Sequence, residues 1–147
     1  MDSSSVNPNR LRERRQRADR VNQLVDVISQ CGRMFFFDSR SGRRARMVVD
    51  DRGRLWWQDE NTGKSIYLHY RYWGQPAFSN GGTLRSLVDA LRNYAMSGET
   101  LQATTFGPWP GWYSGGDPWG YGSDIHRVRQ AALDLGILTA TAVEEAS

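Results

Sequence analysis

The stretch that decides the fold opens with Arg33-Met34-Phe35-Phe36-Phe37-Asp38 and continues through residues 43–50, 54–59 and 64–70. Each segment is short and rich in aromatic or β-branched residues, and a glycine lies in each turn between them. Such runs, separated by turns that contain glycine, are typical of consecutive β-hairpins. The sequence therefore predicts a four-stranded antiparallel meander.

Alternation of apolar and polar residues along these segments predicts which side chains face the core. A strand places successive side chains on opposite faces, so a period of two indicates one covered face and one that is partly wet. The predicted covered face carries Ala45, Met47, Val49, Ile66, Leu68 and Tyr70, and the predicted wet face carries Arg44, Arg46, Tyr67, His69 and one of the pair Trp56 and Trp57.

Helices are expected on both sides of the meander. Apolar residues spaced i, i+3, i+4, i+7 begin at Val21 and predict a helix that ends near Cys31. A second helix is expected after Thr83 and a third from Ser123 or Asp124. We therefore expect a single α+β domain over residues 21–138, flanked by a flexible arginine-rich arm (1–20) and a C-terminal tail (139–147).

Composition limits where the protein acts. The chain has 147 residues, a formal net charge of +3 and one cysteine, Cys31, which excludes an intramolecular disulfide and fits a reducing compartment. The N-terminus lacks the pattern of a signal peptide, and no apolar run approaches the roughly 20 residues of a membrane span. We expect a soluble protein of the bacterial cytoplasm that does not bind a membrane.

Positive charge is concentrated near the N-terminus. Six arginines between Arg10 and Arg20 face two carboxylates, Glu13 and Asp19. Guanidinium groups neutralise phosphates, and aromatic rings on a sheet face stack on unpaired bases. The alternative is a solvated charged face whose field is partly cancelled by the acids at 38, 50, 51, 59 and 60. The nucleic-acid interpretation assigns Arg12, Arg14, Arg15, Arg17, Arg43, Arg44, Arg46, Tyr67 and His69 to the interface.

Residues 107–122 form the most unusual passage, with six glycines, three prolines and five aromatic residues. A long loop of this kind is usually functional. Tryptophan and tyrosine dominate the energetics of protein interfaces, so one interpretation is a protein-binding loop. The other is a lid that buries its rings in the core of the protein itself. The residues concerned are Trp109, Trp112, Tyr113, Trp119 and Tyr121.

Catalytic and metal-binding motifs are not recognisable. Cys31, His69 and His126 are isolated in the sequence, whereas zinc sites draw on clusters at short spacing. His69 has no accompanying nucleophile motif. We therefore expect no enzymatic activity, no metal and no cofactor.

Five short segments carry a resemblance: Val21-Asn22-Gln23-Leu24-Val25, Cys31-Gly32-Arg33, Asp51-Arg52-Gly53-Arg54-Leu55-Trp56, Ile66-Tyr67-Leu68-His69-Tyr70 and Gly81-Gly82-Thr83-Leu84. In this order they resemble small accessory proteins encoded by tailed phages and prophages, over roughly residues 21–97. The resemblance implies an accessory protein of a mobile element that acts inside a bacterium.

Two functions are consistent with these observations. The first is a non-enzymatic accessory protein that binds DNA or RNA, with weak sequence specificity, through the arginine-rich arm and the hairpin at 39–46. The second is a protein-binding inhibitor or adaptor that acts through the aromatic loop. Its partner would be a host defence complex, in the manner of an anti-CRISPR protein, or a transcription complex. The sequence leaves the oligomeric state open.

Overall fold

The computed structural model describes residues 7–70, 73, 77–80, 82–106, 118–120 and 123–139. Within these residues the chain forms three α-helices, one short 3₁₀ helix and five short strands, which confirms the α+β class. In chain order they are α1 (Pro8–Ser29), β1 (Phe37–Asp38), β2 (Arg43–Arg44), β3 (Arg46–Val49), β4 (Leu55–Gln58), β5 (Ser65–Tyr67), α2 (Gly82–Ser97), η1 (Ala103–Phe106) and α3 (Asp124–Asp134).

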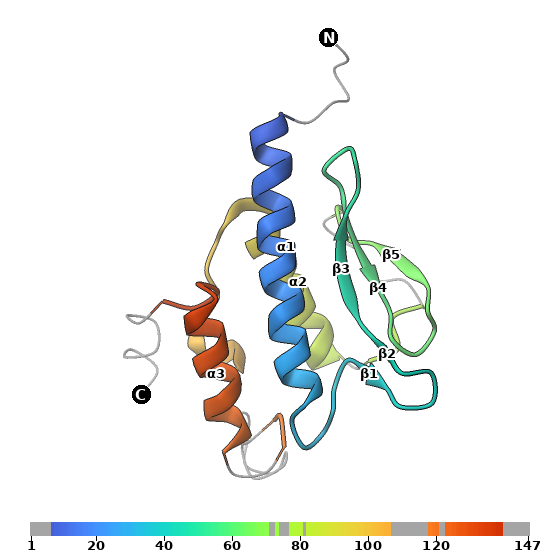
Figure 1. Ribbon diagram of the computed structural model, residues 1–147, viewed down its shortest axis with the longest axis vertical. Helices are drawn as coiled ribbons and strands as arrows, with labels where there is room; N and C mark the ends of the chain where they lie inside the picture. The colour runs from blue at the N-terminus through green and yellow to red at the C-terminus, as the bar shows by residue number, and fades with distance from the viewer. Residues whose placement is uncertain are drawn as a thin grey trace.

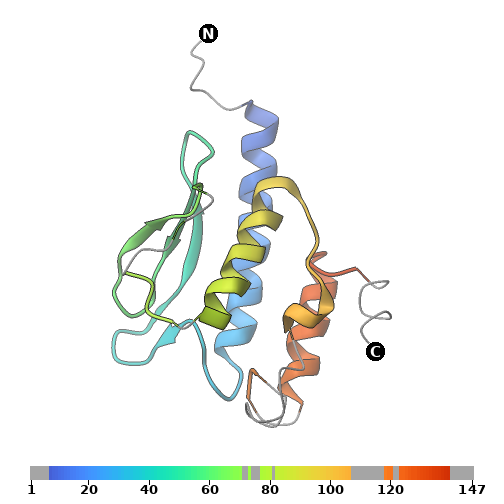
Figure 2. The same ribbon diagram turned by 180° about the vertical axis from the view of Figure 1, so that it is seen from behind.

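Helix α1 is the central element. Figure 1 shows it between the strands on one side and α3 on the other, and Figure 2 shows α2 lying along it from behind. The apolar residues of α1 that are spaced i, i+3, i+4, i+7 are fully buried, as the sequence predicted. They are Val21, Leu24, Val25 and Ile28.

The prediction of a single four-stranded meander is wrong. The strands form a two-stranded antiparallel sheet, β1-β2, and a three-stranded antiparallel sheet, β3-β4-β5. The predicted first strand is shortened because Met34 and Phe36 have φ values of 49° and 66°, which extended strands do not allow. The turn that results buries Phe36 edge-on against Trp57, with ring centroids 5.4 Å apart. The predicted second strand is interrupted at Ala45, whose N–H donates to the Phe36 carbonyl at 2.9 Å.

Alternation of buried and exposed residues is confirmed in β3 and β4. Ala45, Met47 and Val49 are buried, whereas Val48 between them is 47% exposed. In the adjacent pair of tryptophans, Trp57 is fully buried and Trp56 lies on the opposite face, partly exposed; Leu55, Ile66 and Leu68 are also buried. Tyr70 was expected on the covered face but is 60% exposed, because strand β5 ends at Tyr67.

The helix ends follow the glycines. Helix α2 stops before Gly98, whose φ of 83° suits glycine and whose N–H donates to the Tyr94 carbonyl at 2.7 Å. Gly136, with a φ of 75°, follows α3 in the same way. Helix α1 ends at Ser29, two residues before the predicted end. In the described part of the chain, none of the helices combines the length and the apolar composition that a bilayer crossing requires.

Candidate nucleic-acid interface

The segment predicted as a flexible arm is helical from Pro8 onward. Asn7 caps the helix by accepting a hydrogen bond from the Asn9 N–H at 2.8 Å, and Ala18 is already buried. Residues 1–6 and 140–147, which include most of the predicted tail, lie outside the described residues. The mobility of the arm stays a prediction.

Two arginines of this segment bind the C-terminal end of α2. Arg17 donates from Nε to the Ala95 carbonyl at 2.9 Å and from Nη2 to the Met96 carbonyl at 3.1 Å. Arg14 Nε reaches the same Met96 carbonyl at 3.4 Å. Carbonyls in the last turn of a helix lack intrahelical partners and carry partial negative charge, so cations stabilise them. Arg14 and Arg17 therefore have structural roles in addition to the predicted role in binding.

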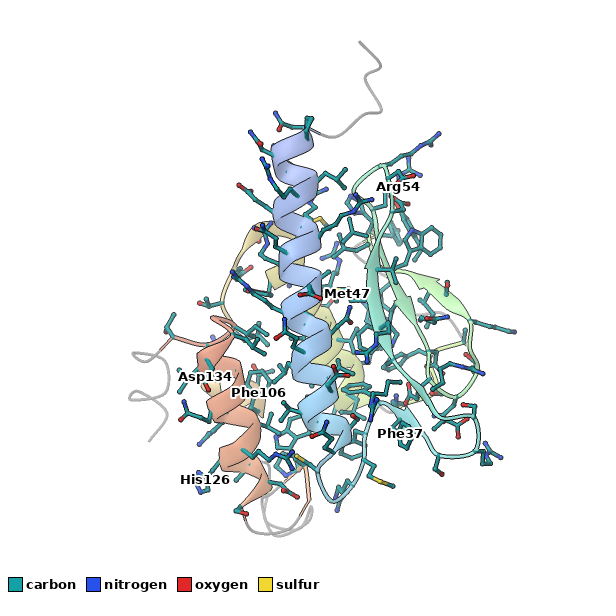
Figure 3. All side chains as sticks on the ribbon, in the orientation of Figure 1. Phe37, Met47, Arg54, Phe106, His126 and Asp134 are labelled. Atoms are coloured by element: carbon teal, nitrogen blue, oxygen red, sulfur yellow. The ribbon has the colours of Figure 1, made fainter. Side chains whose placement is uncertain are left out.

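The same helix half meets the turn between β3 and β4. Arg14 Nη1 donates to the Gly53 carbonyl at 3.0 Å, and Arg15 Nη2 forms an ion pair with Asp51 Oδ1 at 2.9 Å. The turn is fixed by Asp50, whose Oδ1 accepts from the N–H groups of Arg52 and Arg54. Figure 3 labels Arg54 at this end of the strands, beside the first half of α1, and Phe37 at the opposite end.

The two segments 10–17 and 50–54, here called the basic end, hold the whole surplus of positive charge. Together they contain seven arginines and three carboxylates, a net charge of +4 in a chain whose total is +3. Asp50 is occupied by backbone N–H groups, and Asp51 by Arg15. Among the described residues, no hydrogen bond or ion pair engages the guanidinium groups of Arg10, Arg52 and Arg54. These three groups can bind an anion without breaking an existing contact.

A row of aromatic rings starts at the basic end and crosses the face of the three-stranded sheet opposite the core. The Trp56 and Tyr67 rings lie 5.0 Å apart, and the Tyr67 and His69 rings are stacked 6.1 Å apart at 30°. Trp56 Nε1 donates to Asp50 Oδ2 at 3.0 Å, which fixes the indole relative to the turn. All three rings are partly exposed. The sequence predicted Tyr67 and His69 on this face and one of the two tryptophans, which is Trp56.

Most of the charges that act on His69 are positive. Burial lowers the pKa of His69 from its usual 6.5, and the charges of Arg14, Arg92 and Arg54 lower the pKa further, whereas Asp50 opposes them. The imidazole is therefore neutral at pH 7 and offers an uncharged ring.

The fold does not bring the arginines of the hairpin at 39–46 together with those of segment 10–17. Strands β2 and β3 run antiparallel to α1, so Arg15 meets Asp51 while Arg44 lies near the C-terminal end of the helix. Arg44 Nε donates to Ser29 Oγ at 3.0 Å, and its guanidinium lies 5.3 Å from the Phe37 ring centroid. Arg43 lies against Gly63, where a Cβ would collide with its guanidinium.

Arg46 also contacts helix α1. Its Nη1 donates to the Asn22 carbonyl at 3.1 Å, and its Nη2 forms an ion pair with Asp26 Oδ1 at 2.5 Å. Together with Arg44, Arg46 ties the strands to α1. Arg44 and Arg46, which the sequence assigned to the interface, therefore also have structural partners on α1.

The aromatic loop is described only in part. Trp119 is fully buried, packs edge-on against Phe35 with centroids 6.2 Å apart, and donates from Nε1 to the Phe106 carbonyl at 2.8 Å. This ring belongs to the core, as the lid interpretation expects, and its assignment to a protein-binding surface is corrected. The other aromatic residues predicted for that surface, Trp109, Trp112, Tyr113 and Tyr121, lie outside the described residues.

The sequence profile of the YoqU family matches residues 11–144. The chain belongs to the YoqU family. It is 23% identical over 128 residues to the SPbeta prophage-derived uncharacterized protein YoqU of Bacillus subtilis (strain 168), which covers 86% of this chain and 85% of that protein. The resemblance to prophage proteins is thereby confirmed. No solved structure matches the chain.

The region shared with the YoqU family includes residues that the sequence interpretation missed. Arg52 and Arg54 complete the basic end, but the acids at 50 and 51 beside them were expected to cancel part of their field. The signal in the sequence was the spacing of Asp50, whose carboxylate accepts from the N–H groups two and four residues ahead while keeping its negative charge, so that it caps the turn instead of pairing with Arg52 or Arg54. No group of three His, Cys, Asp or Glu side chains suited to a metal occurs within the described residues.

Proposed function

We propose that this phage-type protein is a non-enzymatic accessory protein that binds nucleic acid through the basic end. The observation that carries the proposal is the meeting of segments 10–17 and 50–54, which gathers the surplus charge at one end of the molecule. Phosphates bound there would release condensed counterions, which is the main source of non-specific affinity for nucleic acid. Arg10, Arg52 and Arg54 are the side chains that would contact phosphate.

Binding is expected to depend weakly on sequence and steeply on salt. Contacts to phosphate fix the position of a strand but carry no base information. The expected interface consists of arginines at a helix start and a turn, without a helix or ribbon set into a groove.

The test is a titration of labelled DNA and RNA probes at several salt concentrations with the variant R10Q/R52Q/R54Q. Loss of three phosphate contacts is expected to reduce the slope of log K against log salt by about two to three units. The matched control R40Q/K64Q/R127Q removes the same charge from exposed positions outside the basic end and is expected to keep the wild-type slope. Equal affinities of the two triple variants would overturn the proposal.

The alternative function, inhibition or adaptation of a host complex through residues 107–122, gains no support from the described residues. Trp119 is buried. If the wild-type protein binds none of the probes at low salt, the nucleic-acid proposal is wrong, and a protein partner becomes the working hypothesis.

A further inference from the structure

Phosphate binding alone does not involve the row of aromatic rings formed by Trp56, Tyr67 and His69, here called the ring row. Trp56, Tyr67 and His69 lie on the face of the three-stranded sheet opposite the core, and the row is joined to the basic end through the hydrogen bond from Trp56 to Asp50. Arg54 lies close enough to His69 to lower its pKa. The partly exposed rings therefore lie near the unpaired guanidinium group of Arg54 and next to the turn that carries Arg52.

We propose that the nucleic acid bound at this surface is an unpaired strand whose bases stack on the Trp56–Tyr67–His69 row while its phosphates contact Arg10, Arg52 and Arg54. This inference rests on the proposed function and specifies the substrate of the same site. Single-strand-binding proteins combine these two features, a positively charged track and aromatic side chains that accept the faces of successive bases.

A duplex would leave half of this surface unused. Paired bases are stacked inside the helix and show only their edges, so the rings could contact a duplex only at its backbone. An unpaired strand exposes base faces to aromatic rings. The neighbouring positive field favours a nucleic acid over an uncharged protein surface as the occupant, because phosphates complement it.

The order of the row is consistent with base stacking. Trp56 is held by Asp50, so its ring keeps its orientation without a ligand. The His69 ring is neutral at pH 7 and stacks on Tyr67 at 30°. Tyr67 lies between them and is the ring whose loss interrupts the row.

The experiment compares Tyr67→Leu with Tyr67→Phe on a single strand and on a duplex of about 12 nucleotides, a length within the site sizes of single-strand-binding folds. Oligo-dT is the single-stranded probe, and a mixed-sequence duplex is the other. Tyr67→Leu is expected to weaken oligo-dT binding about 5- to 100-fold, which corresponds to the stacking of one base. Tyr67→Phe keeps the ring and is expected to bind as the wild type does. Neither variant is expected to change duplex binding.

A measurement on the wild-type protein keeps the inference testable if Tyr67→Leu does not fold. The indole N–H resonance of Trp56 is expected to shift on addition of oligo-dT and to remain in place on addition of the duplex. If duplex binds as tightly as oligo-dT and the Trp56 resonance responds to neither, the inference is overturned while the proposed function stands. If R10Q/R52Q/R54Q binds both probes as the wild type does, or if the wild type binds neither, both fall.

Discussion

Asn22, in the middle of helix α1, hydrogen-bonds both backbone groups of Met47 on strand β3. Its Nδ2 donates to the Met47 carbonyl at 2.9 Å, and its Oδ1 accepts from the Met47 N–H at 2.7 Å. Strand β3 is an edge of the three-stranded sheet, with β4 on its other side. The side-chain amide thus supplies the donor and acceptor that a further strand would supply.

Asn22→Ala is therefore expected to destabilise the protein. The substitution leaves a donor and an acceptor of the edge strand without partners, at a cost of about 1–3 kcal/mol in the free energy of unfolding. Urea denaturation followed by circular dichroism measures this change. Gln23→Ala is the matched control, because Gln23 is exposed and, among the residues that the structure describes, bonds only within α1, to Asp19. Equal stability of the two variants would contradict the role assigned to Asn22.

Arg46→Ala is expected to reduce stability by about 1–2 kcal/mol, with the loss of a charged hydrogen bond to the Asn22 carbonyl and of the ion pair with Asp26. We expect a stability loss in the lower part of the range for charged hydrogen bonds, because the Arg46 and Asp26 side chains are 32% and 41% exposed. A double-mutant cycle with Asp26→Ala measures the coupling, which we expect to be about 0.5–1 kcal/mol. A coupling of zero would mean that the pair does not hold β3 to α1.

Local patterns predicted what depends on local geometry. The burial of Ala45, Met47 and Val49 followed from alternation, because the period of a strand is a property of its own backbone. The split of the sheet could not be predicted, because the positive φ of Phe36 is maintained by the packing of its ring on Trp57, in another strand. Such a long-range contact leaves no periodic signal in the sequence.

The candidate site shows the same limit. Charge counting located the arginines of segment 10–17, but not their partners, since Arg17 binds a carbonyl 78 positions further along the chain. The sequence assigned the arm and the hairpin at 39–46 to one nucleic-acid interface. The fold instead places the arm beside the turn at 50–54, because strand β3 runs antiparallel to α1.

Arg17→Ala tests whether the arm is anchored to α2. Removal of the guanidinium exposes the Ala95 and Met96 carbonyls at the helix end, which is expected to lower the free energy of unfolding by about 1–2 kcal/mol. Arg12→Ala is the control, because Arg12 is exposed and, within the described part of the chain, bonds only to Asn9 in its own helix. Its effect is expected within about 0.5 kcal/mol.

Amide exchange locates the boundary of the mobile arm. The sequence alone predicts mobility as far as residue 20. With Arg14 and Arg17 bound to α2, we expect slow exchange from Ala18 onward in the wild type and fast exchange before Arg12. In Arg17→Ala the fast region is expected to extend toward Ala18. Uniformly fast exchange up to Arg20 in the wild type would show that the anchors do not hold in solution.

Two buried carboxylates hold residues 77–80 against the turn between β4 and β5. Asp59 Oδ1 accepts from the Ser79 N–H at 2.8 Å, and Glu60 Oε2 accepts from Asn80 Nδ2 at 3.0 Å. Glu60 is 1% exposed. Burial raises its pKa above the usual 4.5, the hydrogen bond from Asn80 opposes the rise, and the nearby charges of Asp59 and Asp38 add to it.

The raised pKa of Glu60 predicts how stability changes with pH. The native state holds this proton more tightly than the unfolded chain does, so the contribution of Glu60 is fully present below pH 4.5 and is lost as the pH rises through the raised native pKa. Asp38 and Asp50 have lowered pKa values, and their contribution is instead lost as the pH falls below 3.8.

Glu60→Gln cannot ionise, and its amide oxygen can still accept from Asn80. It is expected to remove the decline in stability above pH 4.5, measured by urea denaturation at closely spaced pH values, while the decline at lower pH persists. Glu99→Gln, at an exposed glutamate, is expected to retain both declines. A Glu60→Gln profile that superimposes on that of the wild type above pH 4.5 would show that the buried carboxyl does not control this part of the curve.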